Sequence, residues 1–326
     1  MKICIWYETT DKPYGGANSF LKSLANELKK MGHEVIDRPN SPVDVLLVNS
    51  WTYGVGKRLS FRMVAKVKKY GGLSWSDIIR QSLFAGDKKK IGSIIHRLDG
   101  VAALYGRKDD ADSIQIRINQ LTDYTIFQSE FCRQSFASLG VKPQKSAVIK
   151  NGVDGELYYP ERSVRALTGT MKALAVSWSN NPKKGFSNLV EIASRPGIDL
   201  TFIGNWCASI PQGDIKVLGT MTAPEIAGIM RRCDIFVHPA ENDTCPNVVL
   251  EALASGLPIL YRDSGGTAEL AKGYGVPIAS DNISQSLNEI RERYTDIREK
   301  IFADLQMFSI KHAAEKYLEV FEEIKK

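Results

Sequence analysis

Glu251 and Asp243 are the first residues that suggest chemistry, because both are carboxylates within or beside an apolar stretch, ENDTCPNVVLEALASGLPIL. Residues 246–255 predict a short helix that is apolar on nearly every side, with Pro246 suited to its first turn and Gly256 to its end. A carboxylate in such a helix costs several kcal/mol unless it accepts hydrogen bonds. We therefore expect Glu251 to accept them from a diol such as a ribose, or else to form a structural salt bridge.

The start of the same predicted helix is a candidate anion site. The first backbone N–H groups of a helix have no partner within the helix and favour negative charge. The amides around Asn247 are therefore expected to meet a phosphate, with Asp243 near the group that the phosphate carries.

Two glycine-containing loops could also bind phosphate. The helix FSNLVEIA is preceded by Lys183, Lys184 and a glycine. A lysine at this place could reach phosphate oxygens, although a solvated lysine is the commoner case. Gly15 and Gly16 join the first predicted strand to the first helix, and paired glycines allow a ligand to approach the backbone. This loop is not GxGxxG, so it gives little support to a dinucleotide site and is equally well explained as a tight turn.

His96 and the pair Asp110–Asp112 are the remaining candidates. His96 ends the apolar run IGSII, and a histidine at a strand end is a better candidate for a functional role than for a core position. Asp110-Ala111-Asp112 matches the DxD pattern of metal-dependent sugar transfer, but it follows a charged loop, and we interpret it as a chance occurrence. The four histidines show no metal-ligand spacing, so we predict no metal site.

The composition is that of a globular protein, with 43% hydrophobic and 25% charged residues in a chain of 326. The five cysteines show no CxxC pairing, and the start of the sequence does not resemble a signal peptide, so we expect reduced thiols and a cytoplasmic protein. The net charge of +6 is concentrated in residues 57–90, which carry ten Lys or Arg against Asp77 and Asp87. Within it, GKRLSFRMVAKVKKY fits an amphipathic helix. This segment is either a solvated helix face or a site that docks onto an anionic membrane or an acidic acceptor. No nucleic-acid-binding motif accompanies it.

Apolar strands alternate with helices twice along the chain, which predicts two parallel α/β units. The boundary is expected near Asn151 and Gly152, and the pattern restarts at the strand ALAVSW. We predict one domain at 1–152, a second at 153–308, and an amphipathic helix at 309–326. Two doubly wound domains would place their strand ends around a central crevice, where ligands bind.

These residues resemble the retaining glycosyltransferases of the GT-B fold, specifically glycosyltransferase family 4. The resemblance covers most of the chain, from GGANSFLKSLANELKKMGHEV through HRLDG, IFQSEFCRQSF, VIKNGVD, SWSNNPKKGF and FIGNW to HPAENDTCPNVVLEALASGLPIL and DSGGTAEL. The last part matches the family's E-x7-E region. The resemblance implies a GT-B architecture of two Rossmann-like domains that face a central cleft, with the C-terminal helix crossing back onto the acceptor-side N-terminal domain.

The resemblance also implies roles for matching positions. Asp243, His96 and Lys184 would be the catalytic residues, with Lys184 at the donor diphosphate and His96 near the transferred sugar. Glu251 would hold the donor ribose. The residues implied to bind the donor are Gly15, Gly16, Lys183, Gly204, Asn205, Val217, Leu218, Thr244, Cys245, Pro246, Asn247 and Glu251. Two positions depart from the pattern, because Asp243 stands for the first glutamate and Trp178 for an arginine that many members carry.

The resulting prediction is a metal-independent enzyme that transfers a sugar from a nucleotide-diphosphate sugar to a hydroxyl with retained configuration. We expect no resident cofactor, a UDP- or GDP-linked donor, and an acceptor that is a glycan, a glycolipid or another hydroxyl compound. Nucleic acid is not an expected partner, and peripheral membrane contact through residues 57–90 is an option. Because of the two departures, a second possible function is that of a non-catalytic subunit that binds a sugar nucleotide. Because the fold is shared, a third is that of a nucleotide-sugar epimerase.

Overall fold

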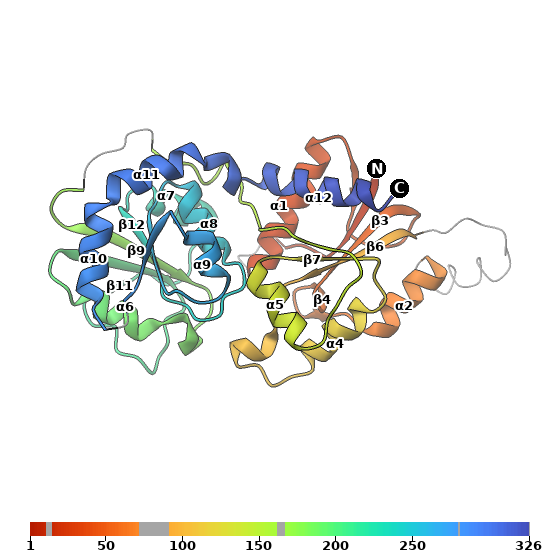
Figure 1. The fold of residues 1–326 in the computed structure, drawn as a ribbon, viewed down its shortest axis with the longest axis horizontal. Coiled ribbons are helices and arrows are strands. Elements are labelled where there is room, and N and C mark those ends of the chain that lie inside the picture. The colour runs from red at the N-terminus through yellow and green to blue at the C-terminus, as the bar shows by residue number, and fades with distance from the viewer. Residues whose placement is uncertain (11–14, 72–90, 162–166, 280, 326) are drawn as a thin grey trace. The chain divides into compact units, whose positions relative to one another are not determined.

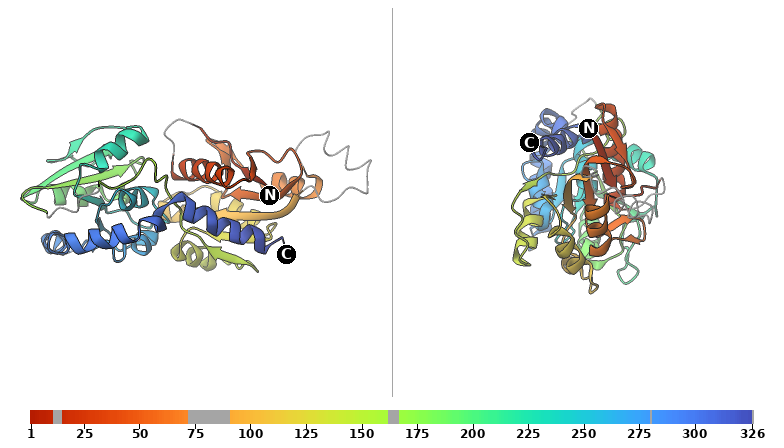
Figure 2. Two further views of the ribbon diagram at one scale, coloured as in Figure 1. Left: turned by 90° about the horizontal axis from the view of Figure 1, so that it is seen from above. Right: turned by 90° about the vertical axis from the view of Figure 1, so that its right-hand side faces the viewer.

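The computed structural model describes residues 1–10, 15–71, 91–161, 167–279 and 281–325. It divides into two compact units: residues 1–150 together with 313–326, and residues 151–312. Each unit contains one six-stranded parallel sheet with helices on both sides (Figures 1 and 2). The predicted α/β class with two Rossmann-like parallel sheets is confirmed.

The first unit has the strand order β2-β1-β3-β6-β7-β8, with every pairing parallel. These strands are runs of mainly buried apolar residues, as expected for a sheet covered on both faces. The strands are β1 (Lys2–Trp6), β2 (Glu34–Ile36), β3 (Val43–Asn49), β6 (Ile91–Leu98), β7 (Tyr124–Phe127) and β8 (Ser146–Val148), beside the two-stranded hairpin β4 (Thr52–Gly54) and β5 (Lys57–Arg58).

The helices of the first unit include the C-terminal end of the chain. They are α1 (Gly16–Lys30), α2 (Phe61–Tyr70), the 3₁₀ turn η1 (Ala102–Tyr105), α4 (Ala111–Asn119), α5 (Glu130–Ser138) and the greater part of α12 (Ile310–Glu323). Tyr317 of α12 contacts Phe20 of α1, with ring centroids 6.0 Å apart. The two ends of the chain accordingly lie close together in all the views of Figures 1 and 2. The C-terminal helix therefore packs on the N-terminal unit.

The second unit has the strand order β11-β10-β9-β12-β13-β14, again with parallel pairings. Counted within the unit, this is the 3-2-1-4-5-6 order of the Rossmann fold, in which the order reverses between the first and fourth strands. The strands are β9 (Met171–Ser177), β10 (Ile198–Gly204), β11 (Lys216–Val217), β12 (Ile235–His238), β13 (Ile259–Tyr261) and β14 (Gly275–Pro277). The reversal lies between β9 and β12.

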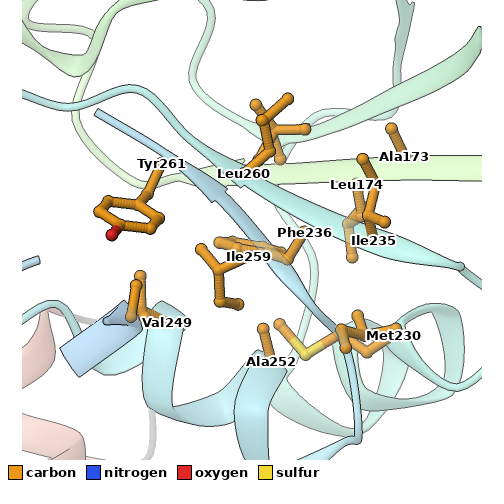
Figure 3. Close-up of a cluster of buried hydrophobic side chains, with 14 of the residues drawn as sticks. Ala173, Leu174, Met230, Ile235, Phe236, Val249, Ala252, Ile259, Leu260 and Tyr261 are labelled. Carbon is orange, nitrogen blue, oxygen red and sulfur yellow. The ribbon is translucent and has the colours of Figure 1, made fainter. Parts of the chain in front are cut away.

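The core of the second unit explains the apolar character of the helix that carries Glu251. Val249 and Ala252 point from this helix toward the sheet, where Phe236 and Ile259 lie (Figure 3). Protein covers nearly every side of this helix, because six of its eight residues are buried: Asn247, Val249, Leu250, Ala252, Leu253 and Ala254. The helical elements of this unit are η2 (Pro182–Lys184), α6 (Phe186–Ala193), α7 (Ala223–Met230), α8 (Asn247–Ala254), α9 (Gly265–Ala271), α10 (Ile283–Glu292), α11 (Tyr294–Ala303) and η3 (Leu305–Phe308).

The basic segment differs from the prediction in its first turn. The sequence GKRLSFRMVAKVKKY fits one helix, but the helix starts at Phe61 because the side chain of Ser60 accepts a hydrogen bond from the amide of Met63, at 3.2 Å. Lys57 and Arg58 instead form β5 and pair with acidic side chains of the same unit. Residues 72–90 of the segment lie outside the described residues. Within the part of the chain that is described, no helix combines the length and apolar character needed to cross a bilayer.

Candidate functional site

Most of the predicted donor-binding residues follow strand ends at one edge of the second sheet. Ligands of open α/β sheets bind outside the carboxyl ends of the strands, at the point where the strand order reverses. Here that point lies between β9 and β12. Lys184 follows the first of these strands, whereas Asp243 follows the second. Topology alone therefore places a candidate ligand site between these two loops.

Lys184 is held by a tight turn that rests on the loop after β12. The side chain of Asn181 caps the turn at the amide of Lys183, 3.0 Å away, and Gly185 ends it with φ of 80°. The carbonyl of Lys183 accepts a hydrogen bond from the amide of Glu241, at 2.8 Å. A Cβ at Gly185 would collide with the carbonyl of Pro239. Glycine is thus required both for the positive φ and for the close approach of the two loops.

The structure brings Lys184 and Asp243 together. The Nζ of Lys184 lies 2.6 Å from the Oδ2 of Asp243, and their side chains are 23% and 14% exposed. Burial raises the pKa of Asp243, but Lys184 and His238 outweigh it and hold this pKa well below its usual range. The aspartate is therefore ionised at neutral pH, and its charge is balanced by the lysine.

The backbone around Asp243 is fixed by the loop that follows β13. Asn242 adopts a left-handed conformation with φ of 55°, and its amide donates to the hydroxyl of Ser264 at 3.0 Å. The carbonyl of Asp243 accepts a hydrogen bond from the amide of Gly266 at 2.7 Å. At Gly265, a Cβ would lie only 2.6 Å from that same carbonyl oxygen. The glycine pair after β13 thus positions the Asp243 loop.

His238, the last residue of β12, is the third ionisable residue at this point. Its Nε2 lies 3.7 Å from the Oδ2 of Asp243, within reach for an ion pair but beyond a hydrogen bond. This nitrogen is buried and makes no hydrogen bond in the structure. Burial lowers the pKa of His238, and the carboxylate of Asp243 offsets that effect only in part. His238 is therefore neutral in this structure at neutral pH.

The start of α8 differs slightly from the prediction. The helix begins at Asn247, and Pro246 is its N-cap, not a residue of its first turn. Thr244, Cys245 and Asn247 are all buried, and the side chain of Asn247 accepts a hydrogen bond from that of Asn151 at 2.8 Å. These residues follow directly on Asp243, but their side chains are packed within the unit. Their predicted contribution to a ligand therefore depends on backbone groups.

Glu251 has a protein partner that the sequence did not reveal. The hydroxyl of Tyr158 donates a hydrogen bond to its carboxylate, and no ion pair to Glu251 occurs among the described residues. Burial raises the pKa of Glu251 to about 7, and the hydrogen bond from Tyr158 lowers it only in part. The side chain is half-buried, so it remains accessible. One phenol does not saturate a carboxylate, which can accept about four hydrogen bonds.

The ends of β9, β10 and β11 bring a further set of predicted residues together. The amide of Asn205 donates to the carbonyl of Ser177 at 3.0 Å, and the side chain of Asn205 donates to the carbonyl of Trp178 at 2.8 Å. The amide of Gly204 bonds to the loop after β11, which contains Leu218. The indole of Trp178 is 41% exposed. Val217 and Leu218 are half-buried and pack against the core.

Gly15 and Gly16 belong to the first unit, at the start of α1. Gly15 is the N-cap with φ of 35°, and both glycines are exposed. The side chain of Asn18 bonds to both backbone groups of Thr10, each at 2.9 Å, and so fastens the loop after β1 to the helix. Tyr14, which precedes the glycines, lies outside the described residues.

His96 is a core residue, which corrects the expectation that it ends its strand. β6 continues to Leu98, and the ring of His96 is fully buried. Its Nε2 lies 2.8 Å from the carbonyl of Ser50, and its Nδ1 lies 3.3 Å from the side-chain amide of Asn119. Burial lowers the pKa of His96 to about 4. Both ring nitrogens serve structural hydrogen bonds, so the structure gives no support to a catalytic role.

The two aspartates of the DxD pattern make contacts within the first unit. Asp112 accepts hydrogen bonds from the amides of Ala102 and Ala103, at 2.6 and 3.0 Å, and Asp110 pairs with Arg58. Over the described ranges, no group of three or more His, Cys, Asp or Glu side chains is arranged to hold a metal ion. All five cysteines are free thiols.

His238, Tyr158 and Ser264 were not among the predicted site residues. The argument applied to His96, a histidine at the end of an apolar run, applies equally to DIFVH and would have identified His238. Tyr158 and Ser264 act through contacts distant in sequence, for which no local pattern exists.

Known proteins show similarity to this chain in sequence over part of its length and in fold over the whole of it. Residues 183–296 match the family model described as Glycosyl transferases group 1. A GDP-mannose-dependent alpha-mannosyltransferase of Mycolicibacterium smegmatis is 29% identical over 93 residues, which are 27% of this chain and 25% of that protein. The gpi3 subunit of the phosphatidylinositol N-acetylglucosaminyltransferase of Schizosaccharomyces pombe is 24% identical over 246 residues, 66% of this chain and 53% of that protein. The chain thus spans only a quarter to about half of these relatives.

Solved structures resemble the chain over its full length. HepE from Anabaena, in complex with UDP-glucose, aligns with a TM-score of 0.68 and 15% identity, covering 99% of this chain and all of that one. At this identity the likeness establishes the fold alone. The family match at 183–296 nevertheless contains Lys184, Asp243 and Glu251. The two Rossmann-like units and these similarities together support a glycosyltransferase of the GT-B fold.

Proposed function

We propose that this protein transfers a sugar from a nucleotide-diphosphate sugar to an acceptor hydroxyl, in the synthesis of a glycan or glycolipid, with retention of the anomeric configuration. The observation that carries the proposal is the Lys184–Asp243 pair at the strand-order reversal of the second sheet. Lys184 is a half-buried cation that two fixed loops hold in place, and it lies within the segment similar to glycosyl transferases group 1.

In this proposal Lys184 binds the diphosphate of the donor. An ammonium group within a partly desolvated site stabilises the charge that develops on a leaving diphosphate. The half-buried carboxylate of Glu251 accepts hydrogen bonds from the ribose hydroxyls, beside the one that Tyr158 already donates. The donor is UDP- or GDP-linked, as the names of the similar proteins suggest.

The transfer step requires no resident cofactor. The bond between the anomeric carbon and the diphosphate oxygen breaks, and the acceptor oxygen forms a new bond to the same face of that carbon. The proton of the acceptor hydroxyl passes to the leaving diphosphate oxygen. Lys184 supplies the positive charge at the diphosphate, so in this proposal the reaction is independent of divalent metal.

The proposal is tested by binding and turnover with UDP-glucose, UDP-N-acetylglucosamine and GDP-mannose. One of these donors is expected to bind by calorimetry and to release its nucleotide when an acceptor is present, with or without EDTA. In Lys184→Met the affinity should fall more than tenfold, or by about 1.4 kcal/mol or more. Lys172→Met is the matched control, because Lys172 is an exposed lysine near the opposite, amino end of β9.

Other outcomes identify the alternatives. Binding without nucleotide release in the presence of glycan and glycolipid acceptors would indicate a non-catalytic subunit. Conversion of the donor sugar to its epimer without an acceptor would indicate an epimerase. Equal donor affinity in Lys184→Met and in the wild type would refute the assignment of the diphosphate to this lysine.

A further inference from the structure

His238 is a buried titratable group with no function in the proposed transfer step. It ends β12 at the strand-order reversal, and its side chain is 6% exposed. Its Nε2 makes no hydrogen bond, and the nearest charged atom that the structure gives for it is the Oδ2 of Asp243, 3.7 Å away. A buried polar atom without a hydrogen bond is costly, so its retention beside a carboxylate calls for an explanation.

The charges around His238 are balanced in the structure. Lys184 and Asp243 form a contact pair of opposite charges at 2.6 Å. These two groups are the charged neighbours that act on His238, from η2 and from the loop after β12. On the adjacent strand β13, Tyr261 pairs with His238, and Arg262 beyond it forms its own pair with Glu241 at 3.1 Å. A proton on His238 would therefore add an unbalanced buried charge.

A bound diphosphate changes this balance. The diphosphate of a nucleotide sugar carries two negative charges, and Lys184 is the cation that meets it in the proposed function. Asp243 then shares its lysine with a second anion, and the site as a whole becomes negative. An imidazolium 3.7 Å from Asp243 would restore the balance and need not move to do so.

We propose that His238 is a positioning residue that takes up a proton when a nucleotide-diphosphate sugar binds, and that the imidazolium then holds Asp243 in place of Lys184. This inference rests on the proposed function, because it requires the donor diphosphate to meet Lys184. Burial keeps the pKa of His238 below its ordinary value of 6.5 before binding, and the added anion raises it. Binding is then linked to uptake of as much as one proton, so the contribution of His238 strengthens affinity by up to tenfold per pH unit as pH falls.

Proton linkage is measured by titration calorimetry with UDP-glucose and GDP-mannose in two buffers of different ionisation enthalpy. A nucleotide sugar is a suitable probe because its diphosphate lacks the terminal phosphate ionisation near pH 6. Glu251, whose pKa is about 7, releases protons when ribose hydroxyls bind its ionised form. The informative quantity is therefore the difference in proton uptake between wild type and His238→Gln, in which the contribution of Glu251 cancels.

We expect His238→Gln to take up fewer protons than wild type, by up to one per donor at about pH 6. His312→Gln is the matched control, since His312 is a half-buried histidine of the same unit on α12, and it should match wild type. Equal proton uptake in wild type and His238→Gln would overturn the inference while leaving the proposed function intact. If neither nucleotide sugar binds at any pH, the proposed function itself fails and this inference with it.

A second measurement does not depend on a variant. The chain has only four histidines, so their ring nitrogens can be assigned by NMR. At about pH 6.5, one ring, that of His238, should change from neutral to doubly protonated on saturation with the bound nucleotide sugar. A ring that stays neutral at saturation would overturn the inference.

Discussion

Replacing Glu251 by glutamine is expected to stabilise the protein while weakening donor binding. The carboxylate lies half-buried on the apolar helix α8, and its partner among the described residues is the hydroxyl of Tyr158. A glutamine side chain has the same shape and can still accept that hydrogen bond, but it never ionises. The substitution therefore isolates the cost of the charge from the cost of lost packing.

The magnitude follows from the pKa of Glu251, which burial raises from 4.5 to about 7. Between these values the folded state holds a proton that the unfolded state has released, so stability falls as pH rises. A difference of about 2.5 in pKa corresponds to about 3 kcal/mol, and partial contact with water lowers this to about 2–3 kcal/mol. The favourable effect of the proton is complete below pH 4.5 and lost above about pH 7.

The assay is urea unfolding of wild type and Glu251→Gln at about pH 4 and about pH 8, monitored by circular dichroism. All other ionisable groups are common to the two proteins and cancel in the difference. We expect similar stabilities at the acidic pH and a glutamine variant that is more stable by about 2–3 kcal/mol at the alkaline pH. Saturating nucleotide sugar should reduce this gap, because ribose hydroxyls favour the ionised carboxylate of the wild type.

The reasoning would be refuted if the stability difference between Glu251→Gln and the wild type were the same at both pH values. That result would mean that Glu251 ionises as easily in the folded chain as in water. A variant that binds the donor as tightly as the wild type would refute the assignment of the ribose to Glu251, whatever its stability. The two outcomes are independent, so the electrostatic and the functional arguments are tested separately.

Three further predictions concern the residues around this site and the core of the first unit. Asp243→Asn should destabilise the protein at neutral pH, because only an ionised Asp243 is stabilised by Lys184; the difference should begin to shrink as pH falls below about 4 and should decrease further towards the much lower pKa of the folded state, which acid titration of urea stability checks. Gly185→Ala should cost about 1–3 kcal/mol, from its φ of 80° and its contact with Pro239, and should weaken nucleotide-sugar binding measured by calorimetry. Burial lowers the pKa of His96 to about 4, so between this value and 6.5 the unfolded state binds a proton that the folded state does not. The free energy of unfolding of the first unit should therefore fall by about 3 kcal/mol as pH is lowered from 6.5 to about 4. His96→Gln should remove this acid sensitivity in hydrogen-exchange measurements.

The sequence was sufficient to predict two parallel sheets because their strands are continuous apolar runs separated by helices. Buried parallel strands and crossover helices have distinct patterns, and both recur in each half of the chain. The start of α2 was predicted less well. Arg58 fits the helical period, yet it pairs with Asp110, and the cap formed by Ser60 makes the helix begin only at Phe61. Such tertiary contacts override a periodic pattern.

Lys184 and Asp243 were both predicted as catalytic residues, with Lys184 at the donor diphosphate, but their pairing was not predicted. The two residues are 59 positions apart, and a contact at that separation depends on the strand order of the sheet. Tyr158 was missed for the same reason. Its hydrogen bond answers part of the problem posed by Glu251, which the sequence attributed to a ligand or a salt bridge.

His96 and His238 both end apolar runs in the sequence, but the structure gives their rings different surroundings. The strand that contains His96 continues past it, and both ring nitrogens of His96 have protein partners. His238 is the last residue of its strand, and its Nε2 makes no hydrogen bond. The residues are alike in type and in preceding sequence. What distinguishes them is the chain that folds over each ring, which a local pattern does not encode.

The charge balance of the second unit constrains how a donor could bind there. Lys184 is already paired with Asp243, so an anionic ligand gains little from the lysine unless it also replaces that partner. A site of this kind binds by exchange: the diphosphate takes the lysine, and the aspartate needs a new cation or a hydroxyl donor. A neutral ligand of the same shape has no charge with which to replace Asp243 as the partner of Lys184. The pair thus disfavours ligands without a diphosphate, and its strength sets the minimum interaction energy that a true donor must supply.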